Sequence, residues 1–109
     1  MKYCCTESDR KDTCYHEFKK GKFNGSFWKE DSLLIHDDNL YILHLADIFR
    51  NVVPSYNEYG ETEIIKEQWN EIYRRVSEID GEIKIIIDEI NCWAKFVFKT
   101  EYIFTILGI

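Results

Sequence analysis

The residues with the strongest metal-binding chemistry are gathered near the start of the chain. Cys4, Cys5, Cys14 and His16 supply three thiols and one imidazole, which are ligand types that zinc accepts. Their spacing is poor, because adjacent cysteines on a strand point to opposite faces and the chain has no CxxC pair. The favoured interpretation is that these are small residues on short strands. We therefore predict no metal and no other cofactor, although the sequence leaves zinc open as an alternative at these four residues.

A second candidate for chemistry is the run His36-Asp37-Asp38, because a neighbouring carboxylate can raise the pKa of a histidine. A polar turn that caps a helix explains the same residues. Glu82-Ile83-Lys84 matches the short ExK of metal-dependent nucleases, but no upstream strand aspartate accompanies it. The chain also lacks HExxH, a nucleophile elbow and a glycine-rich phosphate loop. We predict that the protein is not an enzyme, and a small metal-dependent hydrolase ranks last among the alternatives.

The stretch "YNEYGETEI", residues 56–64, favours protein binding rather than catalysis. It follows Pro54, the only proline of the chain, and holds two tyrosines among carboxylates. Exposed tyrosine supplies contact area at little entropic cost, and carboxylates attract a basic surface. The competing interpretation is a tyrosine that folds back over the start of a helix. We predict that a partner contacts this loop and the preceding helix start, through Asp37, Asp38, Tyr56, Glu58, Tyr59, Glu61 and Glu63.

Composition and charge narrow the class of protein. The chain has 109 residues, enough for the single domain 1–109 that we predict, and its hydrophobic fraction of 45% favours a packed core. The net charge is −6, and residues 54–90 hold ten acidic and four basic side chains. This balance argues against nucleic-acid binding and is compatible with a basic partner. The sequence shows neither a signal peptide nor a membrane helix, so we expect a cytoplasmic protein with reduced cysteines.

The apolar pattern predicts the elements that position these residues. The first third of the chain alternates and contains turn signals, so we expect N-terminal β-strands. Apolar residues then recur at helical spacing over 38–53, where a hairpin is the alternative, and over 62–80, with Thr62 as the N-cap. Residues 82–98 fit a helix by length, although 83–87 alone could be a strand. With a β-branched and aromatic strand at 101–107, the fold class is α+β.

Two stretches carry a resemblance to known proteins. "YGETEI" (Tyr59–Ile64), followed by Trp69, and the terminal "FTILGI" (Phe104–Ile109) resemble small acidic bacterial proteins. Those proteins look like the cytoplasmic immunity proteins of contact-dependent or polymorphic toxin systems. Over residues 56–109, the resemblance implies a protein that binds and neutralises a cognate toxin, often a basic nuclease domain. The alternative within the binding class is a phage-encoded inhibitor that mimics DNA in front of a host nuclease, although residues 1–53 are nearly neutral.

Overall fold

A computed structural model describes residues 1–108 of the chain as an α+β domain built on one five-stranded antiparallel sheet. The strands lie in the order β1-β3-β2-β5-β4, so β1 and β4 form the two edges. The central strands β2 and β5 pair over Glu17–Leu107 to Lys20–Phe104. The bounds of the strands are β1 Cys4–Cys5, β2 Tyr15–Lys20, β3 Leu33–His36, β4 Glu61–Ile65 and β5 Ile103–Leu107.

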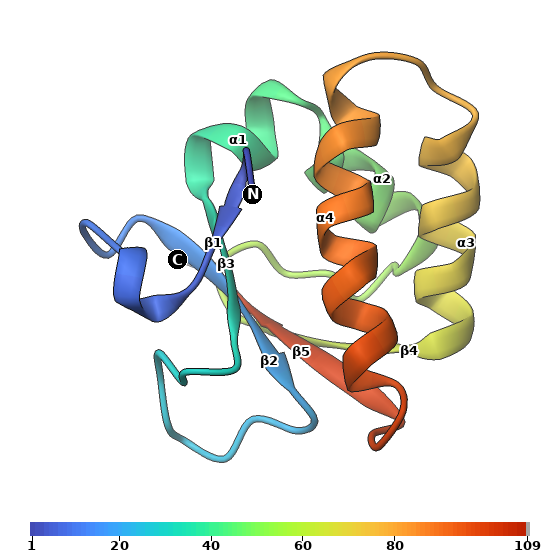
Figure 1. Ribbon diagram of the computed structural model, residues 1–109. Helices are drawn as coiled ribbons and strands as arrows, with labels where there is room; N and C mark the ends of the chain where they lie inside the picture. The colour runs from blue at the N-terminus through green and yellow to red at the C-terminus, as the bar shows by residue number, and fades with distance from the viewer. Residues whose placement is uncertain (109) are drawn as a thin grey trace.

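Four α-helices accompany the sheet, and α3 and α4 lie side by side against it (Figure 1). Their bounds are α1 Asp37–Ile42, α2 Leu45–Val52, α3 Lys66–Ser77 and α4 Glu82–Val97, and a short 3-10 helix spans Glu7–Asp9. Helix α4 buries the isoleucines at positions 83, 86, 87 and 90. Since these positions recur at intervals of three, one and three, they lie on one side of the helix, and this side packs towards the sheet.

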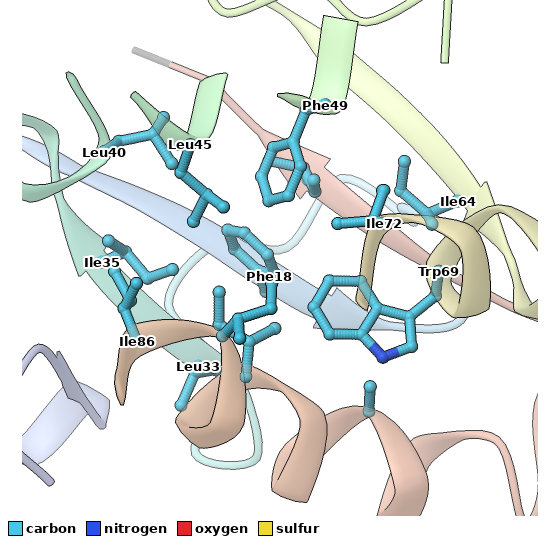
Figure 2. Close-up of a cluster of buried hydrophobic side chains, with 14 of the residues drawn as sticks. Phe18, Leu33, Ile35, Leu40, Leu45, Phe49, Ile64, Trp69, Ile72 and Ile86 are labelled. Atoms are coloured by element: carbon cyan, nitrogen blue, oxygen red, sulfur yellow. The ribbon is translucent and has the colours of Figure 1, made fainter. Parts of the chain in front are cut away.

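Phe18 on β2 lies at the centre of the core between the sheet and the helices (Figure 2). Its ring stacks on Phe104 at 5.8 Å between ring centroids and meets Phe49 of α2 at 6.1 Å. Trp69 of α3 contacts Phe104 edge-on at 5.8 Å. The Phe18–Phe104 contact joins β2 to β5, whereas the contacts of Phe49 and Trp69 join a helix to a strand, so they fix α2 and α3 in place over β2 and β5.

The loop between β2 and β3 covers the part of the opposite sheet face around β2. Glu17 is only 1% exposed, and its carboxylate accepts hydrogen bonds from the Trp28 and Lys29 amides at 2.8 and 3.0 Å and from the Ser32 hydroxyl at 2.6 Å. Lys19, also buried on β2, donates to the Ser26 carbonyl. A buried carboxylate with three donors is a strong anchor, so Glu17 holds this loop on the sheet.

The prediction of one helix over 38–53 is wrong in its continuity. Helix α1 ends at Ile42 and α2 begins at Leu45, with His44 in the left-handed conformation at φ 58°. Leu40 and Leu45 are both fully buried. At about 100° per residue they would lie roughly 140° apart on one continuous helix, too far apart for one buried face. The break lets both leucines reach the core and leaves Ile42 exposed.

The predicted helix over 62–80 begins too early and ends too late. Residues Glu61–Ile65 form β4, paired with β5, and α3 spans only Lys66–Ser77. Thr62 is therefore not the N-cap, because it lies within the strand and faces the core beside Ile64. The helical spacing of Ile65 misled the prediction, since pairing with β5 satisfies the backbone of this segment before the helix begins.

The remaining predicted elements are confirmed with small changes in their bounds. The N-terminal strands exist, the ambiguous segment 82–98 is helix α4, and the C-terminal strand covers 103–107 within the predicted 101–107. Gly81 precedes α4 with φ 112°, a conformation that favours glycine. Cys92 lies on the exposed side of α4.

Candidate functional site

The loop between α2 and β4 is held in one conformation by its own hydrogen bonds. The Asn57 amide donates to the Thr62 hydroxyl at 2.9 Å, and the Asn57 side-chain oxygen accepts from the Tyr59 amide at 3.0 Å. The Gly60 amide donates to the Asn57 carbonyl at 3.2 Å. Thr62 therefore orders this loop through its hydroxyl, although it does not cap a helix. A loop that is ordered before binding loses less entropy when a partner arrives.

Gly108, directly after β5, also holds this loop in place. The Gly108 amide donates to the Gly60 carbonyl at 2.7 Å. A Cβ atom at Gly108 would overlap the carbonyl of Glu58 and lie 2.9 Å from the Tyr59 nitrogen. Only glycine lets the backbone of the loop cross this close to β5.

Gly108→Ala is therefore expected to lower the free energy of unfolding by about 1–3 kcal/mol, because the added methyl group overlaps backbone that must move. Urea denaturation measures the loss, and amide chemical shifts of Glu58 and Tyr59 report the displaced loop. A variant with unchanged stability and unchanged shifts at both amides would show that the close approach is not required.

Glu58 forms hydrogen bonds within the protein and is not free for contact with a partner. Its Oε2 accepts from the Tyr41 hydroxyl at 3.0 Å and from Arg50 Nη1 at 3.3 Å. These bonds join α1, α2 and the loop. Partial burial and the hydrogen bond to Glu58 raise the pKa of Tyr41 to about 12. Because Glu58 is paired with a cation, it is less suited to attracting a basic partner than the sequence suggested.

Tyr56 is buried, so the expectation that it contacts a partner directly is wrong. It is 7% exposed, and its ring meets Phe49 edge-on at 5.5 Å. Burial raises the pKa of Tyr56 above its usual value, with further contributions from Tyr41 and Glu58. Its hydroxyl has no hydrogen-bond partner within residues 1–108. Tyr56 therefore anchors the loop to the core as an apolar ring.

Asp37 is likewise tied to a buried side chain. Its Oδ1 lies 2.7 Å from Nε2 of His16, which is fully buried on β2, and the His16 ring meets that of Tyr41 edge-on at 6.3 Å. A buried imidazole cannot reach a substrate, so the arrangement suits a structural link between β2 and α1 better than acid-base catalysis. Asp38 is exposed, and its nearest basic group is His36 at 3.7 Å.

Tyr41→Phe is expected to remove a pH-dependent contribution to stability. The folded state raises the pKa of Tyr41 to about 12, so the protonated phenol stabilises the fold fully below about pH 10 and this stabilisation is lost as the pH rises through 12. Below pH 10, wild type should exceed the variant by about 1 kcal/mol in free energy of unfolding, the value of one such hydrogen bond. Urea denaturation from pH 8 to 12 tests this, and a difference that stays constant with pH would contradict it.

The predicted contact residues that remain on the surface follow the end of the loop and β4. Tyr59 is 75% exposed, and Glu61 and Glu63 are exposed on the face of β4 that points away from the helices. No Lys, Arg or His nitrogen among residues 1–108 lies within ion-pair distance of either carboxylate. Ile65 is 42% exposed at the end of this row. We call Tyr59, Glu61, Glu63 and Ile65 the β4 surface.

The residues considered for metal or nuclease chemistry are dispersed. Cys4 is buried whereas Cys14 is exposed, and no group of three or more metal-ligating side chains is found in residues 1–108. The His36 Nδ1 accepts from the Asp38 amide at 3.2 Å, so it serves the start of α1. Glu82 of the ExK match accepts from Lys2 Nζ at 2.9 Å and also from the Tyr3 hydroxyl, so it holds the N-terminal segment on α4.

Sequence reasoning missed Tyr41 and Arg50, which support the loop from α1 and α2, and it considered His16 only as a metal ligand and not as a partner of Asp37. The alternation of His16 with Phe18 along β2 was the one available signal, whereas Tyr41 and Arg50 stand alone in the sequence. In the part of the chain that the structure describes, no helix has the length and apolar character that a bilayer crossing requires. No protein-family model, no curated protein and no solved structure matches the chain.

Proposed function

We propose that the protein is an immunity protein that binds and neutralises a cognate bacterial toxin in the cytoplasm. The partner is a basic toxin domain, of the nuclease type. The contact is centred on the β4 surface, where Tyr59 supplies the area that becomes desolvated and Glu61 and Glu63 attract the basic surface. Two features support the proposal: the resemblance of residues 56–109 to immunity proteins, and the exposure and charge of the β4 surface.

The observation that carries the proposal is the combination of exposure and order at the β4 surface. Tyr59 projects from a loop whose backbone is fixed by Asn57, Thr62 and Gly108, so little entropy is lost on binding. No cation within residues 1–108 pairs with the neighbouring carboxylates, so their field reaches into solvent. Unpaired charges of this kind accelerate encounter with an oppositely charged protein, and a central tyrosine is a common hot spot.

The alternative of a DNA mimic has less support. A mimic of DNA needs free carboxylates spread over its surface, but one acid of α3 and the acid at its C-cap are paired with arginines of the helix. Glu71 lies 2.7 Å from Arg74 and 2.9 Å from Arg75, and Glu78 lies 3.1 Å from Arg74. Glu61 and Glu63 lie close together on one face of β4, which suits one localised partner.

The test starts from the neighbouring gene. If the gene immediately upstream encodes a large secreted protein with a variable C-terminal domain, that domain is co-expressed with this protein and the mixture is separated by size-exclusion chromatography. A stoichiometric complex is expected, and its apparent affinity should fall as salt rises. A neighbourhood of metabolic enzymes, together with no complex with any toxin domain tested, would count against the proposal.

A further inference from the structure

The edge strand β4 presents a row of backbone groups whose direction can be read from the pairing with β5. The Gly108 amide bonds to the Gly60 carbonyl, so Gly60 and Gly108 are a hydrogen-bonded pair of the antiparallel ladder. Such pairs alternate with pairs whose backbone groups point away from each other. The groups of Thr62 and Ile64 therefore face β5, whereas those of Glu61 and Glu63 point outward.

The pairing on the other side of β5 agrees with this assignment. The Gly21 amide bonds to the Ile103 carbonyl, so Ile103 directs its backbone groups towards β2. Its neighbour Phe104 then directs its own groups towards β4, where it faces Ile64. The Ile65 amide, which also points away from β5, is already bound by the Gln68 side chain at 3.0 Å. Because Glu61 and Glu63 direct their backbone groups away from β5 and β4 is an edge strand, their amides and carbonyls have no ladder partner within residues 1–108.

The side chains of the same two residues decide what kind of strand fits there. Glu61 and Glu63 lie two positions apart on a strand, so both carboxylates project from the same face at a spacing of roughly 7 Å. An added strand places alternate side chains on that face at the same spacing, and opposite charges in cross-strand pairs are stabilising. Lysine or arginine at alternate positions therefore matches the edge in both backbone and charge.

A second copy of this chain fits the edge less well. If two β4 strands paired antiparallel about Glu63, that glutamate would face its own copy. If they paired about Thr62, Glu61 of one copy would face Glu63 of the other. Like charges directly opposite each other are destabilising, so these registers disfavour self-association.

We propose that the free edge of β4 binds an extended segment of the partner as a sixth strand, with lysine or arginine side chains opposite Glu61 and Glu63. This mode of recognition rests on the proposed function, because it describes how the basic toxin is held. Main-chain hydrogen bonds give such a contact its affinity, and the alternating side chains give it specificity. Tyr59 lies at the start of the added strand and Ile65 at its end.

The test uses isotope-labelled protein and a short synthetic peptide in which lysine and valine alternate. Addition of the peptide is expected to shift the Glu61 and Glu63 amides and to slow their exchange with solvent, while the Thr62 and Ile64 amides, which already face β5, change little in exchange. Glu63→Pro removes one outward amide without touching the bonds to β5, a position where an edge strand tolerates proline. It should weaken peptide binding by about tenfold, which corresponds to the loss of about one main-chain hydrogen bond to the peptide.

Glu63→Gln is the matched control, because it keeps the amide and removes the charge. It should weaken binding less than Glu63→Pro and reduce the dependence on salt. The proposal would be overturned by unchanged exchange at Glu61 and Glu63 under saturating peptide, or by equal affinity of the proline variant and wild type. In that case, the role of these glutamates would be to prevent edge-to-edge aggregation. Protection of the same amides by dimerisation without peptide would also overturn it, in favour of a second copy.

The failure of this inference is distinct from the failure of the proposed function. If folded Glu63→Pro protein still neutralises the toxin as wild type does, the toxin is bound elsewhere and the immunity role stands. If wild type neutralises no toxin, the immunity role fails whatever the peptide does at β4.

Discussion

Glu17→Ala is expected to lower the free energy of unfolding by about 3–5 kcal/mol, because three donors lose a buried charged acceptor at about 1–3 kcal/mol each. The substitution leaves the amides of Trp28 and Lys29 and the hydroxyl of Ser32 without their acceptor. The loop between β2 and β3 should then detach from the sheet.

Chemical denaturation followed by tryptophan fluorescence measures this effect, since Trp28 lies in the loop that is released. Glu17→Gln serves as the control, because its carbonyl oxygen can still accept part of the hydrogen bonding, so its loss should be clearly smaller. If alanine and glutamine variants are both as stable as wild type, the carboxylate is not what holds the loop.

Tyr59→Ala is expected to weaken binding to the cognate toxin by about 2 kcal/mol or more, the size of effect that defines a hot spot. The same change should leave the free energy of unfolding nearly unaltered, because the side chain is 75% exposed. Titration calorimetry with the toxin domain measures the first quantity, and urea denaturation measures the second.

Tyr102→Ala is the matched control, since Tyr102 is 91% exposed and precedes β5 at the end away from the loop. It should change neither affinity nor stability. If Tyr59→Ala loses stability while the folded fraction binds as tightly as wild type, Tyr59 acts as cover for the fold rather than as a contact.

The elements predicted most closely are those whose pattern is long and local. Helix α4 repeats its isoleucines over many turns, and β5 concentrates β-branched and aromatic residues in one run. In both segments, local propensity and the final burial agree. The α+β class followed from recognising these two kinds of segment in one chain.

The errors arose where pairing between distant segments overrides the local pattern. Residues 61–65 have the pattern of a first helical turn, but they pair with β5, a strand that lies about forty residues further along the chain. The interruption at His44 depends on burying both Leu40 and Leu45, which only the assembled core determines. Neither requirement has a signal within a short window of sequence.

The sequence marked the loop as a candidate contact surface but did not separate the roles of its residues. Composition marked the tyrosines and acids equally, whereas the structure buries Tyr56, pairs Glu58 with Arg50 and leaves Tyr59 exposed. The separation depends on Tyr41 and Arg50, which approach the loop from two other helices. Because those contacts are tertiary, the sequence could identify the surface only as a set of residue types.

The most direct test of the account is the growth of cells that express the toxin domain encoded upstream, with and without this protein. The account predicts that wild type restores growth, whereas Tyr59→Ala at the same expression level restores it less and Tyr102→Ala restores it fully. Equal protection by all three proteins would contradict the location of the contact at the β4 surface. Failure of wild type to protect against that domain, although both proteins are folded and present, would contradict the immunity function itself.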